Sequence, residues 1–97
     1  MNQLPPTEML RPAAPARQRA VKVAIEYCEP GNHEKVARRL AEAIAGEFGV
    51  HAVEIETVPS SGGVFEVRID GRLVYSKRAT LRFPSPEEIY YHIRAVG

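Results

Sequence analysis

Apolar and polar residues alternate along three stretches of the chain, and this period of two predicts β-strands with one buried face. The alternating stretches are residues 21–27, 53–56 and 65–69. The third stretch leads into Asp70-Gly71, a pair typical of a two-residue hairpin turn, because the type I′ turn needs positive φ at both positions. The sequence therefore predicts a fourth strand over residues 73–77, antiparallel to the third.

Two further stretches have the period of a helix. Apolar residues recur at every fourth position between residues 36 and 48, and Gly49 suits the C′ position that ends such a helix. At residues 85–88, Ser85 fits an N-cap, proline takes the first position, and Glu88 completes a capping box. An apolar stripe follows, made of Ile89, Ile93 and Val96. The element order is then β-α-β-β-β-α, which indicates an α/β fold.

The first two strands flank a helix, so we expect them to be parallel with a right-handed crossover. Both helices must cover one face, because the alternating strands carry charge on the other; this is a two-layer sandwich. The link at residues 58–63 leaves two alternatives, a direct hairpin or a crossing over the end of the first strand. The crossing spans two strand spacings, about 9.6 Å, and six residues reach roughly 20 Å.

Charged and polar residues on the second strand favour the crossing, because His51, Glu54 and Glu56 are typical of a protected edge strand. The predicted fold is therefore thioredoxin-like, a mixed four-stranded sheet in the order 2-1-3-4 with both helices on one face. In this order the loop at residues 59–63 passes over the end of the first strand. Cys28 lies at that end, between a helix N-terminus and a glycine-rich loop.

The length and net charge of the chain indicate a single domain without a strong electrostatic attraction to nucleic acid or membranes. The chain has 97 residues and a net charge of +1, which fits one domain and gives no field to attract nucleic acid or an anionic membrane. No apolar run is long enough to span a membrane. Residues 1–20, rich in proline, alanine and arginine, predict a disordered tail before a domain at residues 21–97. One cysteine and the lack of an apolar leader favour the cytoplasm.

Several motifs resemble the selenoprotein W-like family (SelT/SelW/SelH, or Rdx). They are Tyr27-Cys28-Glu29-Pro30-Gly31, the stretch 59–67, and the pattern FEV-x-x-DG-x-L-V-x-SK from Phe65 to Lys77. The resemblance covers about residues 21–97 and implies a thioredoxin-like fold with thiol or selenol redox chemistry, linked to glutathione and peroxide. The family carries a second cysteine or a selenocysteine where this chain has Gly31. The resemblance therefore extends to a role for Cys28 and not to a dithiol cycle.

Two interpretations of Cys28 stay open. As a nucleophile it forms mixed disulfides with glutathione or a thiol-bearing protein partner, and this needs an exposed sulfur and a thiolate. The helix N-terminus favours the thiolate, whereas Glu26 and Glu29 oppose it. Alternatively, Cys28 is a small apolar residue that closes a strand, and the domain is a non-catalytic protein-binding module.

Nearby residues extend this candidate site. His33 either assists the thiol as a cation or base, or is an exposed first-turn residue. Ser61, Gly62 and Gly63 offer backbone N–H groups to a peptide or glutathione at the same site as Gly31, or they form a turn that needs positive φ. The three histidines lie on separate elements, so we expect no metal site and no cofactor. Those histidines are His33, His51 and His92.

The hairpin register decides a second candidate surface. If Ile69 pairs with Arg72, then Leu73 and Tyr75 lie on the open face of the sheet with Ala24. They form an apolar patch suited to a partner or to a dimer. The alternative is a bulge that turns one of them inward.

Overall fold

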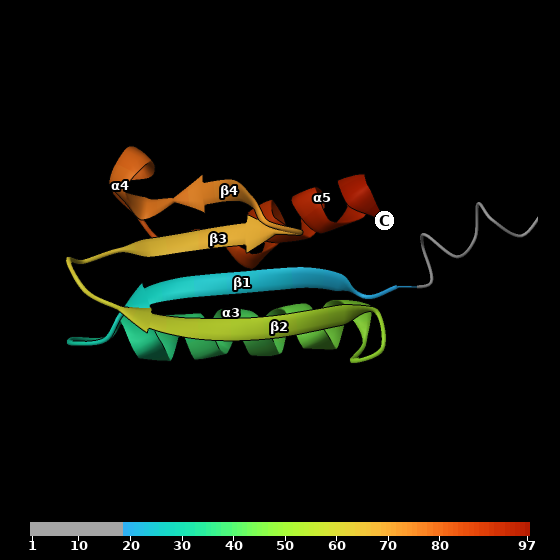
Figure 1. Ribbon diagram of the computed structural model, residues 1–97, viewed down its shortest axis with the longest axis horizontal. Helices are drawn as coiled ribbons and strands as arrows, with labels where there is room; N and C mark the ends of the chain where they lie inside the picture. The colour runs from blue at the N-terminus through green and yellow to red at the C-terminus, as the bar shows by residue number, and fades with distance from the viewer. Residues whose placement is uncertain (1–18) are drawn as a thin grey trace, which may run out of the picture.

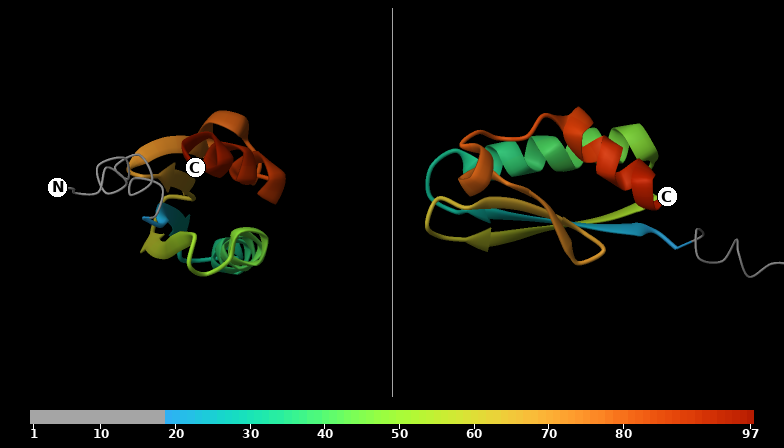
Figure 2. Two further views of the ribbon diagram at one scale, coloured as in Figure 1. Left: turned by 90° about the vertical axis from the view of Figure 1, so that its right-hand side faces the viewer. Right: turned by 90° about the horizontal axis from the view of Figure 1, so that it is seen from above.

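The computed structural model describes residues 19–97, which form a four-stranded sheet with two longer helices packed on one face (Figures 1 and 2). The strands are β1 (Val21–Cys28), β2 (Val53–Ser60), β3 (Phe65–Ile69) and β4 (Arg72–Ser76). The helices are α3 (His33–Phe48), α4 (Lys77–Thr80) and α5 (Pro86–Val96). Residues 1–18 of the predicted tail, residues 1–20, lie outside the described residues.

The sheet has the order β2-β1-β3-β4, as predicted. β1 and β2 are parallel, whereas β3 is antiparallel to both β1 and β4. Figure 2 shows α3 and α5 on the same side of the sheet, which confirms the two-layer α/β arrangement. None of the helices within residues 19–97 is long and apolar enough to cross a membrane.

The core lies between the sheet and the two longer helices. Its members alternate along the strands and recur with helical period on α3 and α5, as the sequence pattern requires. The fully buried side chains include Val23, Ile25, Ile44, Phe65, Val67 and Ile89. Burial of each such side chain contributes about 1.5–3 kcal/mol, so this layer accounts for most of the stabilisation.

Helix α5 begins with the predicted capping box. The Ser85 hydroxyl accepts a hydrogen bond from the backbone N–H of Glu88, and the Glu88 carboxylate accepts one from the backbone N–H of Ser85 at 2.8 Å. Helix α3 begins after Asn32, whose side chain makes no capping hydrogen bond. The first residue of α3, His33, is therefore positioned by packing and not by a side-chain cap.

Strand β2 is longer than predicted. Pro59 and Ser60 belong to β2, paired with Tyr27 and Cys28, and only residues 61–64 cross over the end of β1. The Ser60 carbonyl accepts from the N–H of Glu29 at 2.9 Å. The backbone N–H and C=O groups of even-numbered residues of β2 therefore point toward β1, and those of odd-numbered residues point outward. An edge strand tolerates proline at an outward position, because no partner needs its N–H.

The hairpin register differs from the simple one. A β-bulge lies between Val67 and Arg68, so Val67 pairs with Tyr75 and Arg68 pairs with Leu73. Val74 is the extra residue, and the side chains of β4 that follow it point to the opposite face from the one expected in the simple register. Tyr75 is consequently only 8 % exposed, whereas Leu73 is 46 % exposed. The expected patch of Leu73 and Tyr75 on the open face is wrong, and the alternative of a bulge that turns one residue inward is confirmed.

Candidate functional site

Cys28 ends the central strand β1 and is held by the backbone on both sides. Its N–H donates to the carbonyl of Val64 at 2.8 Å, and its Cα partner on β2 is Ser60. The crossing segment, residues 61–64, connects these two neighbours. The structure therefore places Cys28 beside the crossing segment, with 8 % of its surface exposed.

The charges expected to oppose a Cys28 thiolate are partly engaged elsewhere. Glu26, two residues before Cys28 on β1, lies 3.5 Å from the Arg68 guanidinium, which also lies 3.5 Å from Glu66. This half-exposed ion-pair cluster lies on the open face of the sheet, where solvent screens it. Glu29 begins the turn into α3, is exposed, and forms no ion pair with any described residue.

Gly31 and His33 meet in the turn between β1 and α3. Gly31 has a φ of +87°, a conformation that other residues adopt only with strain. A Cβ added there would lie 3.9 Å from Nδ1 of His33. A side chain at position 31 would therefore start beside the imidazole, and no Cys28 atom lies as close.

His33 is not the exposed first-turn residue of one interpretation. Its ring packs against Phe83 with the centroids 5.1 Å apart, and Phe83 packs in the same manner against Phe65 in the core. Both ring nitrogens are buried and have no hydrogen-bond partner among the described residues. The imidazole thus lies in an aromatic cluster, with no hydrogen bond to Cys28 that would let it act as a base in this conformation.

The sequence pattern did not reveal Phe83 as a neighbour of the site. It lies in the irregular link between α4 and α5, where no apolar period marks a buried position. The only available signal was an aromatic residue flanked by Pro84 and a polar stretch. Lys77 also approaches this cluster, with its Nζ 5.4 Å from the centre of the Phe83 ring.

The glycines of the crossing segment are required by its backbone. Gly62 and Gly63 have φ values of +79° and +72°, and a Cβ at either position would meet nothing within 4 Å. The turn interpretation therefore holds for both residues. The open space around them also leaves their backbone accessible from outside, next to Cys28.

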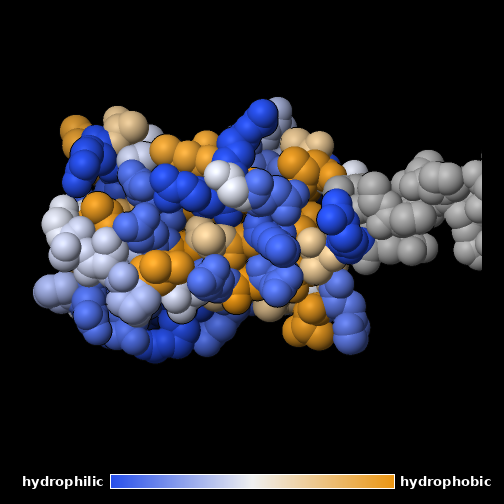
Figure 3. Space-filling view, viewed as in Figure 1, coloured by the Kyte–Doolittle hydropathy of each residue, from blue (hydrophilic) through white to orange (hydrophobic). Residues whose placement is uncertain are grey.

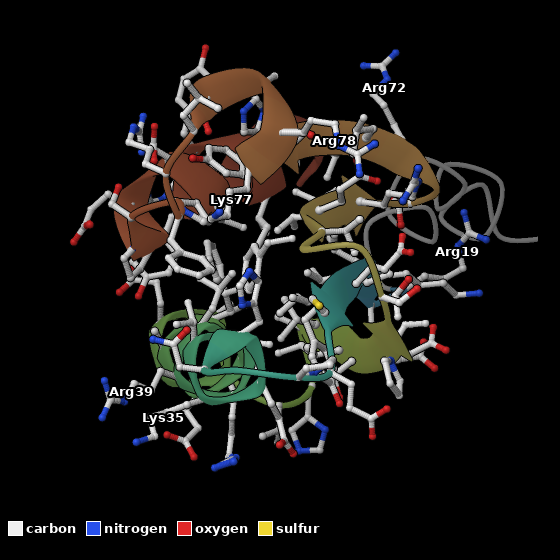
Figure 4. The ribbon with its side chains drawn as sticks, turned by 90° about the vertical axis from the view of Figure 1, so that its left-hand side faces the viewer. Arg19, Lys35, Arg39, Arg72, Lys77 and Arg78 are labelled. Carbon is white, nitrogen blue, oxygen red and sulfur yellow. The ribbon has the colours of Figure 1, made fainter. Side chains whose placement is uncertain are left out.

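The cations near this end of the molecule do not converge on one point. Figure 4 shows Lys35 and Arg39 extending from α3 on one side, whereas Lys77 and Arg78 lie on α4 on the other. Within residues 19–97, no three His, Cys, Asp or Glu side chains come together as a metal site would require. Figure 3 shows that the uncovered face of the sheet is mainly hydrophilic, with separate apolar patches.

The strand order, the two helices on one face and the position of the cysteine define a thioredoxin-like α/β domain. The profile of the Rdx family matches residues 22–95. The chain therefore belongs to the Rdx family, the group of selenoprotein W-like proteins that the motifs resemble.

Solved structures share this fold. A selenoprotein W-related protein from Vibrio cholerae superposes with a TM-score of 0.74 at 19% identity, covering 80% of this chain and 98% of that one. A protein from Bordetella parapertussis gives 0.73 at 25% identity, with 79% and 98% covered.

Two curated relatives are migration and invasion enhancer 1 of Bos taurus and of Mus musculus. Each is 35% identical over 74 residues, which is 76% of this chain and 63% of the relative. The chain thus spans less than two thirds of the length of these relatives.

Proposed function

We propose that this protein takes part in thiol–disulfide exchange through Cys28 as a single thiol. The observation that carries the proposal is the position of the chain's one cysteine. It ends the central strand, just before α3 and beside the crossing segment, in a member of the Rdx family. The N-terminal end of α3 carries partial positive charge, which favours a nearby thiolate.

In the exchange step one disulfide bond breaks and another forms, so no oxidant other than glutathione disulfide is needed. The Cys28 thiol loses its proton to solvent, and the thiolate attacks one sulfur of glutathione disulfide. The disulfide bond of glutathione breaks, a bond from Cys28 to one glutathione forms, and the other glutathione leaves as a thiolate. A thiolate of a partner protein then attacks the glutathione sulfur of the mixed disulfide; the bond to Cys28 breaks, the Cys28 thiolate is restored, and the partner carries the glutathionyl group.

The low exposure of Cys28 sets a condition on this chemistry. Only 8 % of the residue is exposed, so an incoming disulfide needs a local displacement of the chain around it; the neighbouring crossing segment, residues 61–64, is the part we propose to move. Gly62 and Gly63 have open space around them and suit such a displacement. The backbone of Ser61, Gly62 and Gly63 would then border the bound peptide. A single reduced thiol suits a reducing compartment such as the cytoplasm.

Mass spectrometry of the folded protein tests the proposal. Incubation with glutathione disulfide is expected to add one glutathionyl group, removable by reduced glutathione, and Cys28→Ser is the control that adds none. Gly62→Ala with Gly63→Ala should speed the reaction, because both substitutions strain the closed crossing segment and so favour its displacement. If the adduct forms only in denaturant, Cys28 is a structural residue and the proposal fails.

The burial of Cys28 and the glycine at position 31 also favour a second candidate function, a protein-binding module without catalysis. This candidate expects partners to bind Cys28→Ser as well as they bind the unchanged protein. Pull-downs with both proteins, without added reductant so that mixed disulfides persist, compare the two cases. Partners that are lost with Cys28→Ser contradict the binding module and support the thiol function.

A further inference from the structure

Strand β2 forms one outer edge of the sheet along its whole length. It has eight residues, pairs with β1 on its inner side, and pairs with no other strand within residues 19–97. Figure 1 shows β2 at the margin of the sheet, with α3 behind it. Unpaired edges of this kind can accept an added strand unless charge, proline or a covering element prevents it.

The ladder to β1 identifies the peptide groups that are free. The carbonyls of Ala52 and Ser60 accept from the N–H groups of Val21 and Glu29, each at 2.9 Å. The backbone N–H and C=O groups of even-numbered residues therefore point toward β1. Odd-numbered residues point outward, because successive peptide groups of a strand face opposite sides. The outward N–H groups therefore belong to Val53, Ile55 and Thr57, and Pro59 ends the series because it has no N–H.

A groove runs beside this edge on the helix-covered side of the sheet. Its volume is about 340 Å³, and it is lined by Tyr27, Glu34, Ala37, Arg38, Ala41 and Thr57. Thr57 pairs with the buried Ile25 and so faces the same side, yet it is exposed. Helix α3 thus leaves the later half of β2 uncovered, with space for the side chains of an added strand.

On the opposite side of the edge, the charged side chains of β2 itself are acidic. Glu54 and Glu56 are exposed on the open face of the sheet and form no ion pair with any described residue. A hollow of about 520 Å³ lies there, lined in part by both carboxylates on the edge strand and by Lys22 and Arg68 on the inner strands. Lysine or arginine side chains of an added strand would lie beside these carboxylates, where opposite charges stabilise cross-strand pairs.

We propose that the outer edge of β2 binds an extended basic peptide segment of a partner protein, which adds to the sheet as a fifth strand. Main-chain hydrogen bonds to Ile55 and Thr57 supply affinity, and Glu54 and Glu56 select for positive charge. The same carboxylates disfavour a second copy of this chain. Antiparallel pairing of two β2 strands about their middle brings Glu54 and Glu56 of both copies together on one face. This site does not depend on the chemistry of Cys28.

Amide hydrogen exchange of the full chain, followed by NMR, tests the proposal. The probe is a capped peptide of alternating lysine and valine, eight residues long to match β2. At about ten times its Kd, exchange at Ile55 and Thr57 is expected to slow about tenfold, with Glu56 unchanged. A matched peptide of alternating glutamate and valine is expected to give no slowing. Slowing with neither peptide, or equal slowing with both, overturns the proposal.

Two sets of variants locate the effect. Thr57→Pro removes an outward N–H and should abolish the slowing at Ile55, whereas Thr57→Val keeps the N–H and should preserve it. The double variant Glu54→Lys with Glu56→Lys keeps every N–H and should reverse the preference, so that the acidic peptide binds. If the double variant keeps the preference for the basic peptide, the proposed charge selection is wrong.

The free protein distinguishes other occupants. The proposal expects Ile55 and Thr57 to exchange rapidly before peptide is added. Slow exchange that does not vary with protein concentration would assign the edge to this chain's own residues 1–18. Slow exchange that increases with protein concentration would assign it to a second copy. Either result overturns the proposal.

Discussion

The imidazole of His33 stands edge-on to the ring of Phe83, with the centroids 5.1 Å apart and the planes at 71°. Phe83 makes a second edge-on contact with Phe65, which is fully buried. The three rings connect the first turn of α3 to the core through the link between α4 and α5. His33 therefore serves this fold as an aromatic side chain, although both of its nitrogens are buried without a partner.

His33→Phe is expected to raise the free energy of unfolding by about 1 kcal/mol, because it keeps the ring contact and removes two unsatisfied polar atoms. Urea denaturation measures the change. The control is His51→Phe, at an exposed position, which should stay within about 0.5 kcal/mol of the unchanged protein. A loss of stability in His33→Phe would mean that the nitrogens have partners in solution.

The strand order could be predicted because it depends on local features. The hairpin turn at Asp70-Gly71 and the length of the link after β2 leave two possible topologies, and the charges on β2 favour the observed one. The position of Cys28 at the end of the central strand follows from that order. These inferences required only the alternation of residues and the reach of the chain.

Other features depend on contacts that no local pattern contains. Pro59 is a strand breaker by composition, and it fits β2 only because its nitrogen faces away from β1. The bulge at Val67 and Arg68 lies beyond the turn that fixes the start of the hairpin. The burial of His33 depends on Phe83, fifty residues later in the chain. Tertiary packing decides all three.

Gly31 is the residue at which this chain departs from its family's motif, and its φ of +87° makes its replacement costly. Gly31→Ala is expected to lower the free energy of unfolding by about 1–2 kcal/mol. Gly46→Ala is the matched control, since Gly46 lies within α3 without positive φ and has open space around it. That variant should gain roughly 0.5–1 kcal/mol. Equal effects in the two variants would contradict the turn geometry.

Tyr75 is turned inward by the bulge, and its hydroxyl donates to the carbonyl of Arg82 at 2.6 Å. Tyr75→Phe is expected to lower the free energy of unfolding by about 0.5–1.5 kcal/mol, because the hydrogen bond is lost while the ring stays buried. Tyr91→Phe serves as the control, since Tyr91 is 69 % exposed and should show almost no change. No effect in either variant would favour the unbulged register, with Tyr75 on the open face.

Glu88 makes the stability of the domain sensitive to acid. Its carboxylate accepts from the Arg82 guanidinium at 2.6 and 2.9 Å and from the backbone N–H of Ser85 at 2.8 Å. Chiefly through the bonds from Arg82, and then through Ser85, these contacts lower the pKa of Glu88 from 4.5 to about 2. In the unfolded chain the carboxyl has no such partners and keeps its ordinary pKa.

Because the folded pKa lies below the unfolded one, the contribution of Glu88 to stability is complete above about pH 5. It is lost as the pH falls toward the folded value of about 2. Glu88→Gln should therefore be less stable than the unchanged protein at neutral pH, and the difference should disappear near pH 2. Urea denaturation across this range measures the difference. Glu87→Gln, in the same turn of α5, is the control and should show a difference that does not follow this pH dependence. A deficit of Glu88→Gln that persists at the acid end would mean that the lost side-chain shape, and not the carboxylate charge, carries the effect.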